Sequence, residues 1–312
     1  MIFNRIVSSS PPSKVSQALK TSLKSFINVI EVGPRDGLQN EMKCLPVSTK
    51  VELIKKLVDS GVKNIEAGSF VNYTKVPQMH GTDEVIEKSK DICKESKCNL
   101  SVLLPHKSYV KNIGKGDEGV NEIVFFVSAS NSFNLKNINT DITGAFKRFS
   151  DINKELVLQN KRKIKIRGSI SCCWGCPYEG KVEHQAIKNI IKRYEDLGVD
   201  MIDICDTIGN ATSSTTELLL SKINSYVPFS LHLHDTNGQA IQSALKGVQM
   251  GIKTVQSSIA GLGGCPFSPK RAGNVDTVKL VKMLHSEGYN TGINVDELEK
   301  ISEWIKNELK QN

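Results

Sequence analysis

Eight short apolar segments, rich in β-branched residues, alternate along this chain with stretches long enough to form helices. The eight segments, which we expect to form strands, are residues 28–32, 64–70, 100–104, 122–128, 165–171, 201–206, 230–234 and 254–260. A crossover helix between consecutive strands forces them to pair in parallel through right-handed connections. The alternation therefore predicts an α/β fold, the (β/α)8 TIM barrel, with residues 27–312 forming one domain.

The stretches with the clearest helical spacing, three of which end just before a glycine, are residues 51–60, 141–159, 182–197 and 239–250. An additional C-terminal helix, residues 295–309, follows the eighth unit. The alternative is an open, doubly wound sheet, which would carry a glycine-rich phosphate-binding turn after its first strand. The segment there reads Gly33-Pro34-Arg35-Asp36-Gly37 and lacks that spacing, which favours the barrel.

Composition and hydropathy exclude several classes of partner. No run of 18 consecutive apolar residues occurs in the 312-residue chain, so we expect no membrane association. The 41 basic and 33 acidic residues give a net charge of +8, and because the two signs alternate rather than cluster, we expect no nucleic-acid partner. Eight cysteines are too few for a disulfide scaffold and are typical of reduced thiols.

The N-terminus differs from the rest of the chain in composition. Residues 1–30 contain no Asp or Glu, whereas they hold seven serines and four basic residues. This composition is typical of a mitochondrial transit peptide, and a disordered tail on a cytosolic protein is the alternative. We therefore expect residues 1–26 to be a transit peptide or a disordered tail, and the protein to reside in the mitochondrial matrix or, alternatively, in the cytoplasm.

Polar and charged residues gather where the expected strands end. In a TIM barrel the carboxyl ends of the strands carry the active site, so these residues are the first candidates for function. They are Arg35, Asp36, Glu66, Ser69, Arg167, Asp206, His232, His234 and, after the eighth strand, Cys265 and Asn274. The expected helices contribute almost no residues of this kind, which favours an active-site rim at one end of the barrel.

The sharpest single signal is the sequence His232-Leu233-His234. Residues two apart on a strand point the same way, so both imidazoles would face the barrel interior. Two neutral neighbouring imidazoles form a natural metal pair, although such a pair also occurs as ordinary polar filling. With the Asp36 carboxylate from the end of the first strand, the set favours Mg²⁺ or Mn²⁺, with Co²⁺ or Fe²⁺ as alternatives, over a thiolate-bound structural zinc.

Arg35 and Cys265 each have a catalytic and a structural interpretation. The Arg35 guanidinium beside Asp36 could stabilise a developing oxyanion, or it could form a surface ion pair. Cys265 lies between glycines and a proline, where a thiol of lowered pKa can act as acid or base, but a lone cysteine is more often a small apolar residue. The Cys173-Trp174-Gly175-Cys176 motif has no second copy to complete a zinc site, which favours loop packing over redox or metal chemistry.

Several motifs resemble those of the 3-hydroxy-3-methylglutaryl-CoA (HMG-CoA) lyases, a family of the DRE-TIM metallolyase superfamily. The matching segments are Val32-Gly33-Pro34-Arg35-Asp36-Gly37-Leu38-Gln39-Asn40-Glu41, Ser69-Phe70-Val71, Val76-Pro77-Gln78-Met79, Gly175-Cys176-Pro177-Tyr178-Glu179-Gly180, Asp206-Thr207-Ile208-Gly209, His234-Asp235-Thr236, Gly238-Gln239-Ala240 and Gly261-Leu262-Gly263-Gly264-Cys265-Pro266. The resemblance runs from about residue 27 to about residue 295, and the last of these segments is specific to the lyase branch.

The resemblance implies cleavage of HMG-CoA to acetyl-CoA and acetoacetate, a step of ketone-body formation and leucine breakdown. It implies a Mg²⁺ or Mn²⁺ ion whose ligands are Asp36, His232, His234 and Asn274. Other roles follow from the same resemblance: Arg35 as the electrophilic cation, Cys265 as a loop thiol in proton transfer, and Glu66 and Asp206 as supporting carboxylates. We further expect His232 to relay the hydroxyl proton, the enzyme to be a homodimer, and the acyl-CoA substrate to contact Arg35, Gln39, Ser69 and Arg167.

Two alternatives remain open at this point. A condensing relative would join acetyl-CoA to a 2-oxoacid, but such synthases usually carry more sequence after the barrel than one helix. A metal-binding barrel without turnover is the other alternative, because the loop segment Pro269-Lys270-Arg271 and residue Ser169 depart from the usual pattern of the family.

Overall fold

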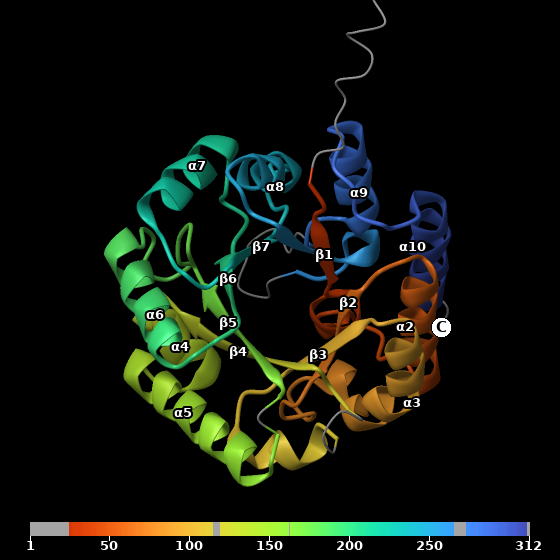
Figure 1. The fold of residues 1–312 in the computed structure, drawn as a ribbon, viewed down its shortest axis with the longest axis horizontal. Coiled ribbons are helices and arrows are strands. Elements are labelled where there is room, and N and C mark those ends of the chain that lie inside the picture. The colour runs from red at the N-terminus through yellow and green to blue at the C-terminus, as the bar shows by residue number, and fades with distance from the viewer. Residues whose placement is uncertain (1–24, 115–118, 162, 265–272, 311–312) are drawn as a thin grey trace, which may run out of the picture.

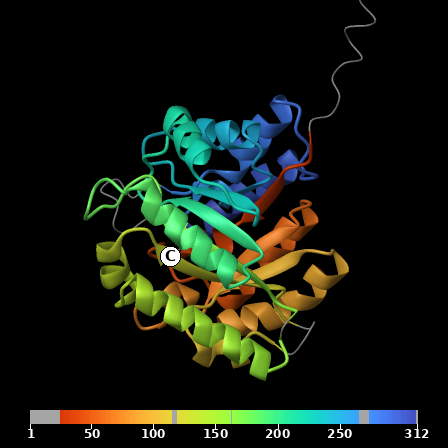
Figure 2. The ribbon, with the colours of Figure 1, turned by 60° about the vertical axis from the view of Figure 1, so that its left-hand side comes forward.

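The computed structural model describes residues 25–114, 119–161, 163–264 and 273–310. Its strands form one closed barrel in sequence order, in which the first strand pairs in parallel with the last (Figures 1 and 2). The strands are β1 (Asn28–Glu31), β2 (Asn64–Ser69), β3 (Asn99–Leu103), β4 (Glu122–Ser128), β5 (Lys165–Ser171), β6 (Met201–Asp206), β7 (Phe229–Leu233) and β8 (Thr254–Ser257). The predicted TIM barrel is confirmed.

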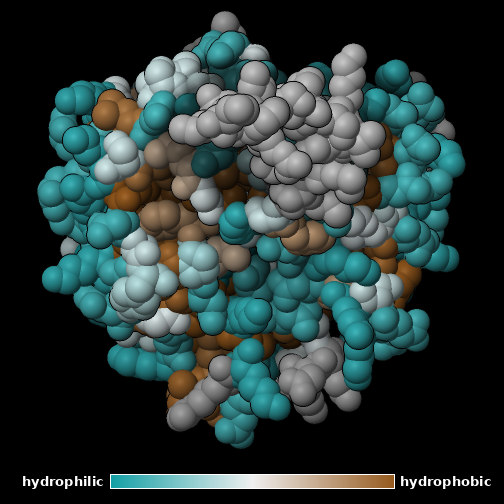
Figure 3. All heavy atoms as spheres, turned by 45° about the horizontal axis from the view of Figure 1, so that its top comes forward, coloured by the Kyte–Doolittle hydropathy of each residue, from teal (hydrophilic) through white to brown (hydrophobic). Residues whose placement is uncertain are grey.

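The helices surround the barrel on its outer side (Figure 1). They are α2 (Val47–Asp59), α3 (Thr82–Glu95), α4 (Asn131–Ile138), α5 (Ile142–Leu158), α6 (His184–Asp196), α7 (Ser213–Lys222), α8 (Ala240–Gln249), α9 (Thr277–Ser286) and α10 (Val295–Lys310). The predicted additional helix is α10, which packs against α9 and α2. On the face seen in Figure 3, hydrophilic residues dominate the periphery and hydrophobic ones show in the recesses between them.

Two connections differ from the expected alternation. Between β3 and β4, the described residues form a 3-10 helix, Lys107–Asn112, in place of an α-helix. Pro105 precedes this segment and Gly114 and Gly119 follow it, and these residues disfavour a longer helix. The last strand also ends earlier than predicted, at Ser257, because the chain turns into a 3-10 segment in which Ala260 has a positive φ of 61°.

The buried carboxyl group of Glu31 fixes the carboxyl end of β1 to the segments that follow β8. One oxygen accepts the backbone N–H groups of Gly33 at 2.7 Å and Ile259 at 2.8 Å, and the other accepts the Thr277 hydroxyl at 2.6 Å. Burial raises the pKa of Glu31 to about 7, and the three hydrogen bonds offset this effect only in part. Glu31 thus holds in place the turn that carries Arg35 and Asp36.

We predict that Glu31→Gln removes a component of the pH dependence of stability. The folded protein holds the Glu31 proton more tightly than the unfolded chain, whose ordinary value is 4.5, so this contribution to stability is full below about pH 4.5 and is lost as the pH rises through 7. The raised pKa corresponds to a loss on the order of 3 kcal/mol. Urea unfolding at pH 4.5 to 8 should show a wild-type decline that the variant lacks; parallel profiles would contradict the prediction.

Candidate active site

Three predicted metal ligands meet at the carboxyl ends of the strands. His232 lies on β7 and His234 just after it, and their rings are 5.2 Å apart. Asp36 comes from a single turn of π-helix, Gly33–Gly37, directly after β1. Its Oδ2 atom is 3.9 Å from Nε2 of His232 and 4.0 Å from Nε2 of His234, and one ligand atom from each residue lies within 4.8 Å of the others. The three side chains point toward one another, as the sequence predicts.

Asn274 completes the set of donors. It pairs with His234 through an isolated antiparallel bridge, and its amide Nδ2 donates to Oδ2 of Asp36 at 2.7 Å. Its Oδ1 atom is buried and has no hydrogen-bond partner among the described residues. An unsatisfied buried acceptor costs free energy, and a bound cation would supply the missing partner. Two imidazoles, a carboxylate and an amide oxygen therefore fit a divalent cation.

The Asp36 carboxylate is ionised despite its burial. Desolvation raises its pKa, but the Arg35 guanidinium, the two imidazoles when they carry a proton, and the hydrogen bond from Asn274 outweigh this and hold the pKa of Asp36 well below its ordinary value. Nη1 of Arg35 donates to Oδ1 of Asp36 at 2.6 Å, which leaves Oδ2 facing the histidines. Asp36 is thus oriented as a ligand before any ion binds.

A buried ion-pair network lies beneath these residues. Arg167 on β5 is fully buried and donates to Glu66 at 2.9 Å, Glu122 at 2.9 Å and Asp203 at 3.2 Å. The three carboxylates, against the effect of burial, raise the pKa of Arg167 above its ordinary value. Glu66 also accepts a hydrogen bond from Nε of Arg35, so one carboxylate connects the two guanidinium groups.

A second chain of hydrogen bonds sets the tautomer of His232. The Ser230 hydroxyl donates to Asp203 at 2.5 Å and accepts the Gln256 amide Nε2 at 3.2 Å. The other end of this amide, Oε1, faces Nδ1 of His232 at 2.9 Å. Because a carbonyl oxygen only accepts, Nδ1 carries a proton, and in the neutral ring the lone pair is on Nε2, the atom that faces Asp36.

The structure places the other predicted residues in three kinds of position. Gln39 and Arg35 line a cavity of about 730 Å³ that also contains Asp36, His232 and His234. Glu66, Ser69, Arg167, Asp206 and Asn274 are buried and do not line it. Cys265 lies outside the described residues, although the preceding Gly264 lines the cavity.

Asp206 is occupied by its own loop. Its two oxygens accept the backbone N–H groups of Asn210 at 3.0 Å and Ala211 at 2.6 Å, and burial raises its pKa. The carboxylate that joins the network is instead Asp203, three residues earlier on the same strand. Asp203, Ser230 and Gln256 are three residues of this site that the sequence alone did not identify. The period of two along a strand was the available signal, since Ser230 precedes His232 by two positions.

The Cys173–Cys176 segment packs within a loop, as the sequence favours. Cys172 and Cys176 form a small buried cluster with Phe133, and the Cys176 thiol lies 2.9 Å from the Ser130 hydroxyl. The thiol of Cys173 donates to the carbonyl oxygen of Ile170 at 3.1 Å.

We predict that Gln256→Leu weakens binding of Mn²⁺ to the protein by about 10- to 100-fold, the usual cost of losing an orienting partner of a metal-binding histidine. Leucine removes the acceptor that keeps the proton on Nδ1 of His232. Electron paramagnetic resonance of free Mn²⁺ gives the affinity directly. Gln256→Glu keeps an acceptor and serves as the matched control, with affinity close to wild type; an unchanged affinity in Gln256→Leu would show that the contact does not orient the ring.

Comparison with known proteins places this architecture in a family. The HMGL-like family matches residues 26–305. The mitochondrial hydroxymethylglutaryl-CoA lyase of Homo sapiens is 38% identical over 305 residues, covering 96% of this chain and 91% of that protein. The cytoplasmic 3-hydroxy-3-methylglutaryl-CoA lyase of Mus musculus is 37% identical, covering 91% and 81%. An HMG-CoA lyase structure from Acinetobacter baumannii, in complex with coenzyme A and 3-methylmalate, is 30% identical and superposes with a TM-score of 0.82, covering 92% of each chain. This chain therefore belongs to the HMGL-like family, the HMG-CoA lyases among the DRE-TIM metallolyases.

Proposed function

We propose that this protein is an HMG-CoA lyase that cleaves HMG-CoA to acetyl-CoA and acetoacetate with Mg²⁺ or Mn²⁺. One observation carries the proposal: Asp36, His232 and His234 converge beside Arg35 at one cavity, with Asn274 hydrogen-bonded to Asp36, in a chain 38% identical to a lyase over nearly its full length. Acetoacetate formation places the reaction in ketone-body formation and leucine breakdown.

The reaction needs a base for a tertiary hydroxyl group and stabilisation of a thioester enolate. A divalent cation held by Asp36, His232, His234 and Asn274 would acidify the substrate hydroxyl and polarise its neighbouring oxygens. Arg35 borders the cavity, and Glu66 and Asp36 hold it in place. Burial lowers the pKa of Arg35, but the two carboxylates outweigh this and raise it above its ordinary value. Its fixed positive charge is suited to stabilise the enolate oxygen.

His232 has one ring nitrogen available to the cavity. Nδ1 is hydrogen-bonded to Gln256, so Nε2 is the atom that would hold the cation and also the atom that would accept the hydroxyl proton. Its single lone pair would serve only one of these roles at a time. Cys265 is proposed to protonate the enolate carbon, which the position of Gly264 at the cavity wall supports. Asn40 holds that wall through a hydrogen bond to the Gly264 carbonyl.

Substrate contacts are assigned by position. Arg35 and Gln39 line the cavity and are proposed to contact the acyl group directly. Ser69 and Arg167 lie beneath the lining, so we propose that they, with Glu66, support the residues that touch substrate. Lys75 and Arg148 line the same cavity and offer positive charge to the phosphates of an acyl-CoA.

The proposed compartment is the mitochondrial matrix, with residues 1–26 acting as a transit peptide ahead of a single catalytic domain; the cytoplasm is the alternative. The absence of acidic residues from the N-terminus supports the mitochondrial matrix. Of the two related lyases compared above, one is described as mitochondrial and the other as cytoplasmic. The proposed assembly is a homodimer. Among the described residues, no helix is both long and apolar enough to cross a membrane. Imaging of the full chain with a C-terminal fluorescent fusion, together with sequencing of its mature N-terminus, tests the compartment.

We predict that purified protein releases acetoacetate from HMG-CoA with Mg²⁺ or Mn²⁺, and that EDTA abolishes the release until excess metal restores it. A coupled assay for acetoacetate makes the measurement. Thiol release from acetyl-CoA with a 2-oxoacid, without cleavage of HMG-CoA, would instead identify a condensing synthase. Tight Mn²⁺ binding with no product under any divalent metal would identify a barrel without turnover.

We predict that Arg35→Ala and Cys265→Ala each lower kcat by about 100-fold or more, the usual cost of losing a group that acts in the transition state. Circular dichroism should show that the fold is unchanged. Lys192→Ala, on the exposed side of α6, is the matched charge-removal control and should retain wild-type activity. Near wild-type turnover in either active-site variant would refute the role assigned to that residue.

A further inference from the structure

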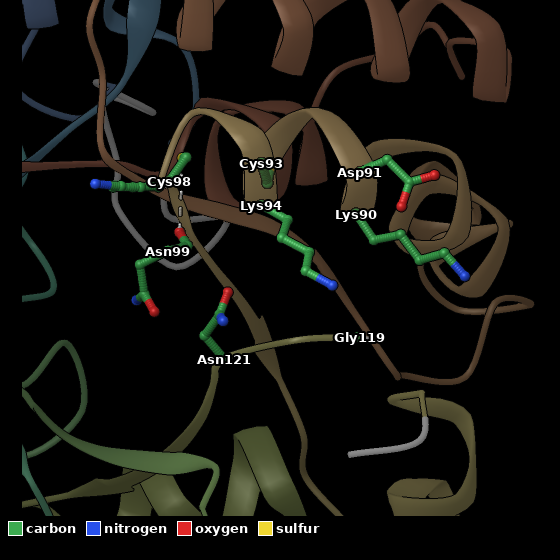
Figure 4. Close-up of a pocket in the computed structure, with 9 residues that line it drawn as sticks. Lys90, Asp91, Cys93, Lys94, Cys98, Asn99, Gly119 and Asn121 are labelled. Carbon is green, nitrogen blue, oxygen red and sulfur yellow. Dashed lines mark hydrogen bonds between the residues drawn. The ribbon is translucent and has the colours of Figure 1, made fainter. Parts of the chain in front are cut away.

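A second cavity, of about 490 Å³, lies where β3 begins, at the opposite end of this strand from the active site. Figure 4 shows its lining, in which Lys90, Cys93 and Lys94 come from the last turns of α3, and Cys98 precedes β3. Lys97 adds a third cation to this wall. The proposed lyase reaction uses none of these residues.

The backbone brings the two cysteines of this cavity together. Helix α3 ends in a Schellman motif, in which the N–H of Cys98 donates to the carbonyl oxygen of Cys93 at 2.7 Å and that of Lys97 to Lys94 at 3.2 Å. Lys97 occupies the left-handed position, with φ of 53°. In this motif the side chains at the positions of Cys93 and Cys98 usually form an apolar contact. Here both are thiols.

The two thiols line the same cavity from the two ends of this motif. The neighbouring Cys98 thiol lowers the pKa of Cys93 against the opposing effect of burial. The Cys93 thiol, together with burial, raises the pKa of Cys98. Cys98 Sγ also lies 3.9 Å from the Asn99 carbonyl oxygen. The exposed fractions of Cys93 and Cys98 are only 2% and 4%, so small molecules in the cavity have better access to them than large ones.

We propose that Cys93 and Cys98 form a redox-active dithiol that small hydroperoxides oxidise to a disulfide. The Cys93 thiolate attacks a peroxide oxygen, the O–O bond breaks, and Cys93 becomes a sulfenic acid as hydroxide or alkoxide leaves. The Cys98 sulfur then attacks the Cys93 sulfur, the S–S bond forms, and the S–O bond breaks with release of water. With hydrogen peroxide, the two thiols lose two electrons, and two water molecules form in total. A dithiol reductant reverses the change.

The other described cysteines lack this combination of features. Burial raises the pKa of Cys172 to about 12, and it likewise raises that of Cys173. Cys172 and Cys176 also lie together in a buried cluster, but neither lines this cavity, and Cys176 contacts the Ser130 hydroxyl. Cys205 lines the active-site cavity, and burial raises its pKa well above the ordinary value. Cys44 is exposed and lies far from the pair in sequence, which makes it a control for nonspecific oxidation.

The test uses the full, reduced wild-type protein. After brief treatment with hydrogen peroxide, free thiols are blocked with N-ethylmaleimide and the chain is cut with trypsin. Cleavage after Lys90, Lys94, Lys97 and Lys107 places Cys93 on the peptide 91–94 and Cys98 on the peptide 98–107. We expect mass spectrometry to find these two peptides joined by a disulfide that dithiothreitol removes. We also expect loss of alkylation at Cys93 to be about tenfold faster than at Cys176.

Two variants separate the proposal from nonspecific oxidation. Cys98→Ser should abolish the linked peptide and leave a Cys93 sulfenic acid that dimedone traps, whereas Cys44→Ser should leave the linkage intact. Failure to find the linked peptide in folded wild-type protein, or its persistence in Cys98→Ser, would overturn the proposal. Acetoacetate release before and after oxidation is measured separately, and because the pair is remote from the active site, we expect less than a twofold change.

Discussion

The fully buried guanidinium of Arg167 is the interaction on which the active-site end of the barrel depends. It lies on β5 and bonds to carboxylates on β2, β4 and β6, namely Glu66, Glu122 and Asp203. A charge in a protein interior costs several kcal/mol in desolvation, so it is retained only where its hydrogen bonds are well satisfied. All three carboxylates share one guanidinium group, so removing one of them would change the net charge around the other two. These residues therefore act as one unit.

Two arms extend from this centre to opposite sides of the metal ligands. Glu66 bonds to Arg35, and Arg35 orients Asp36. On the other side, Asp203 accepts from Ser230, which accepts from Gln256, and Gln256 fixes the tautomer of His232. Ligands from the first and seventh strands thus derive their orientation from one buried group. Such preorganisation supplies geometry before substrate arrives, which is what metal-assisted enolate chemistry requires.

The sequence predicts the barrel well because parallel strands buried on both faces are apolar along their length, and glycines mark the helix ends. It also predicts the ligands, since His232 and His234 alternate on one strand and Asp36 follows another. It could not distinguish Asp206 from Asp203, because both are acids near the end of β6 and only the fold shows which one faces the barrel axis. Arg167 was expected at the substrate, but its position in the middle of β5 places it below the cavity, where charge pairing determines its contacts.

The charge of the connected network explains why a divalent cation suits this site. Two guanidinium groups, Arg35 and Arg167, are bonded to four carboxylates, Asp36, Glu66, Glu122 and Asp203, which leaves 2 − 4 = −2 when all are ionised. Burial and the neighbouring carboxylates Asp203 and Glu66 raise the pKa of Glu122. Holding the excess negative charge in the interior therefore costs free energy. A cation of charge +2 between the imidazoles and Asp36 would neutralise the excess while leaving Arg35 positive toward the cavity. The network thus favours binding of a divalent cation and leaves the positive charge of Arg35 available at the cavity.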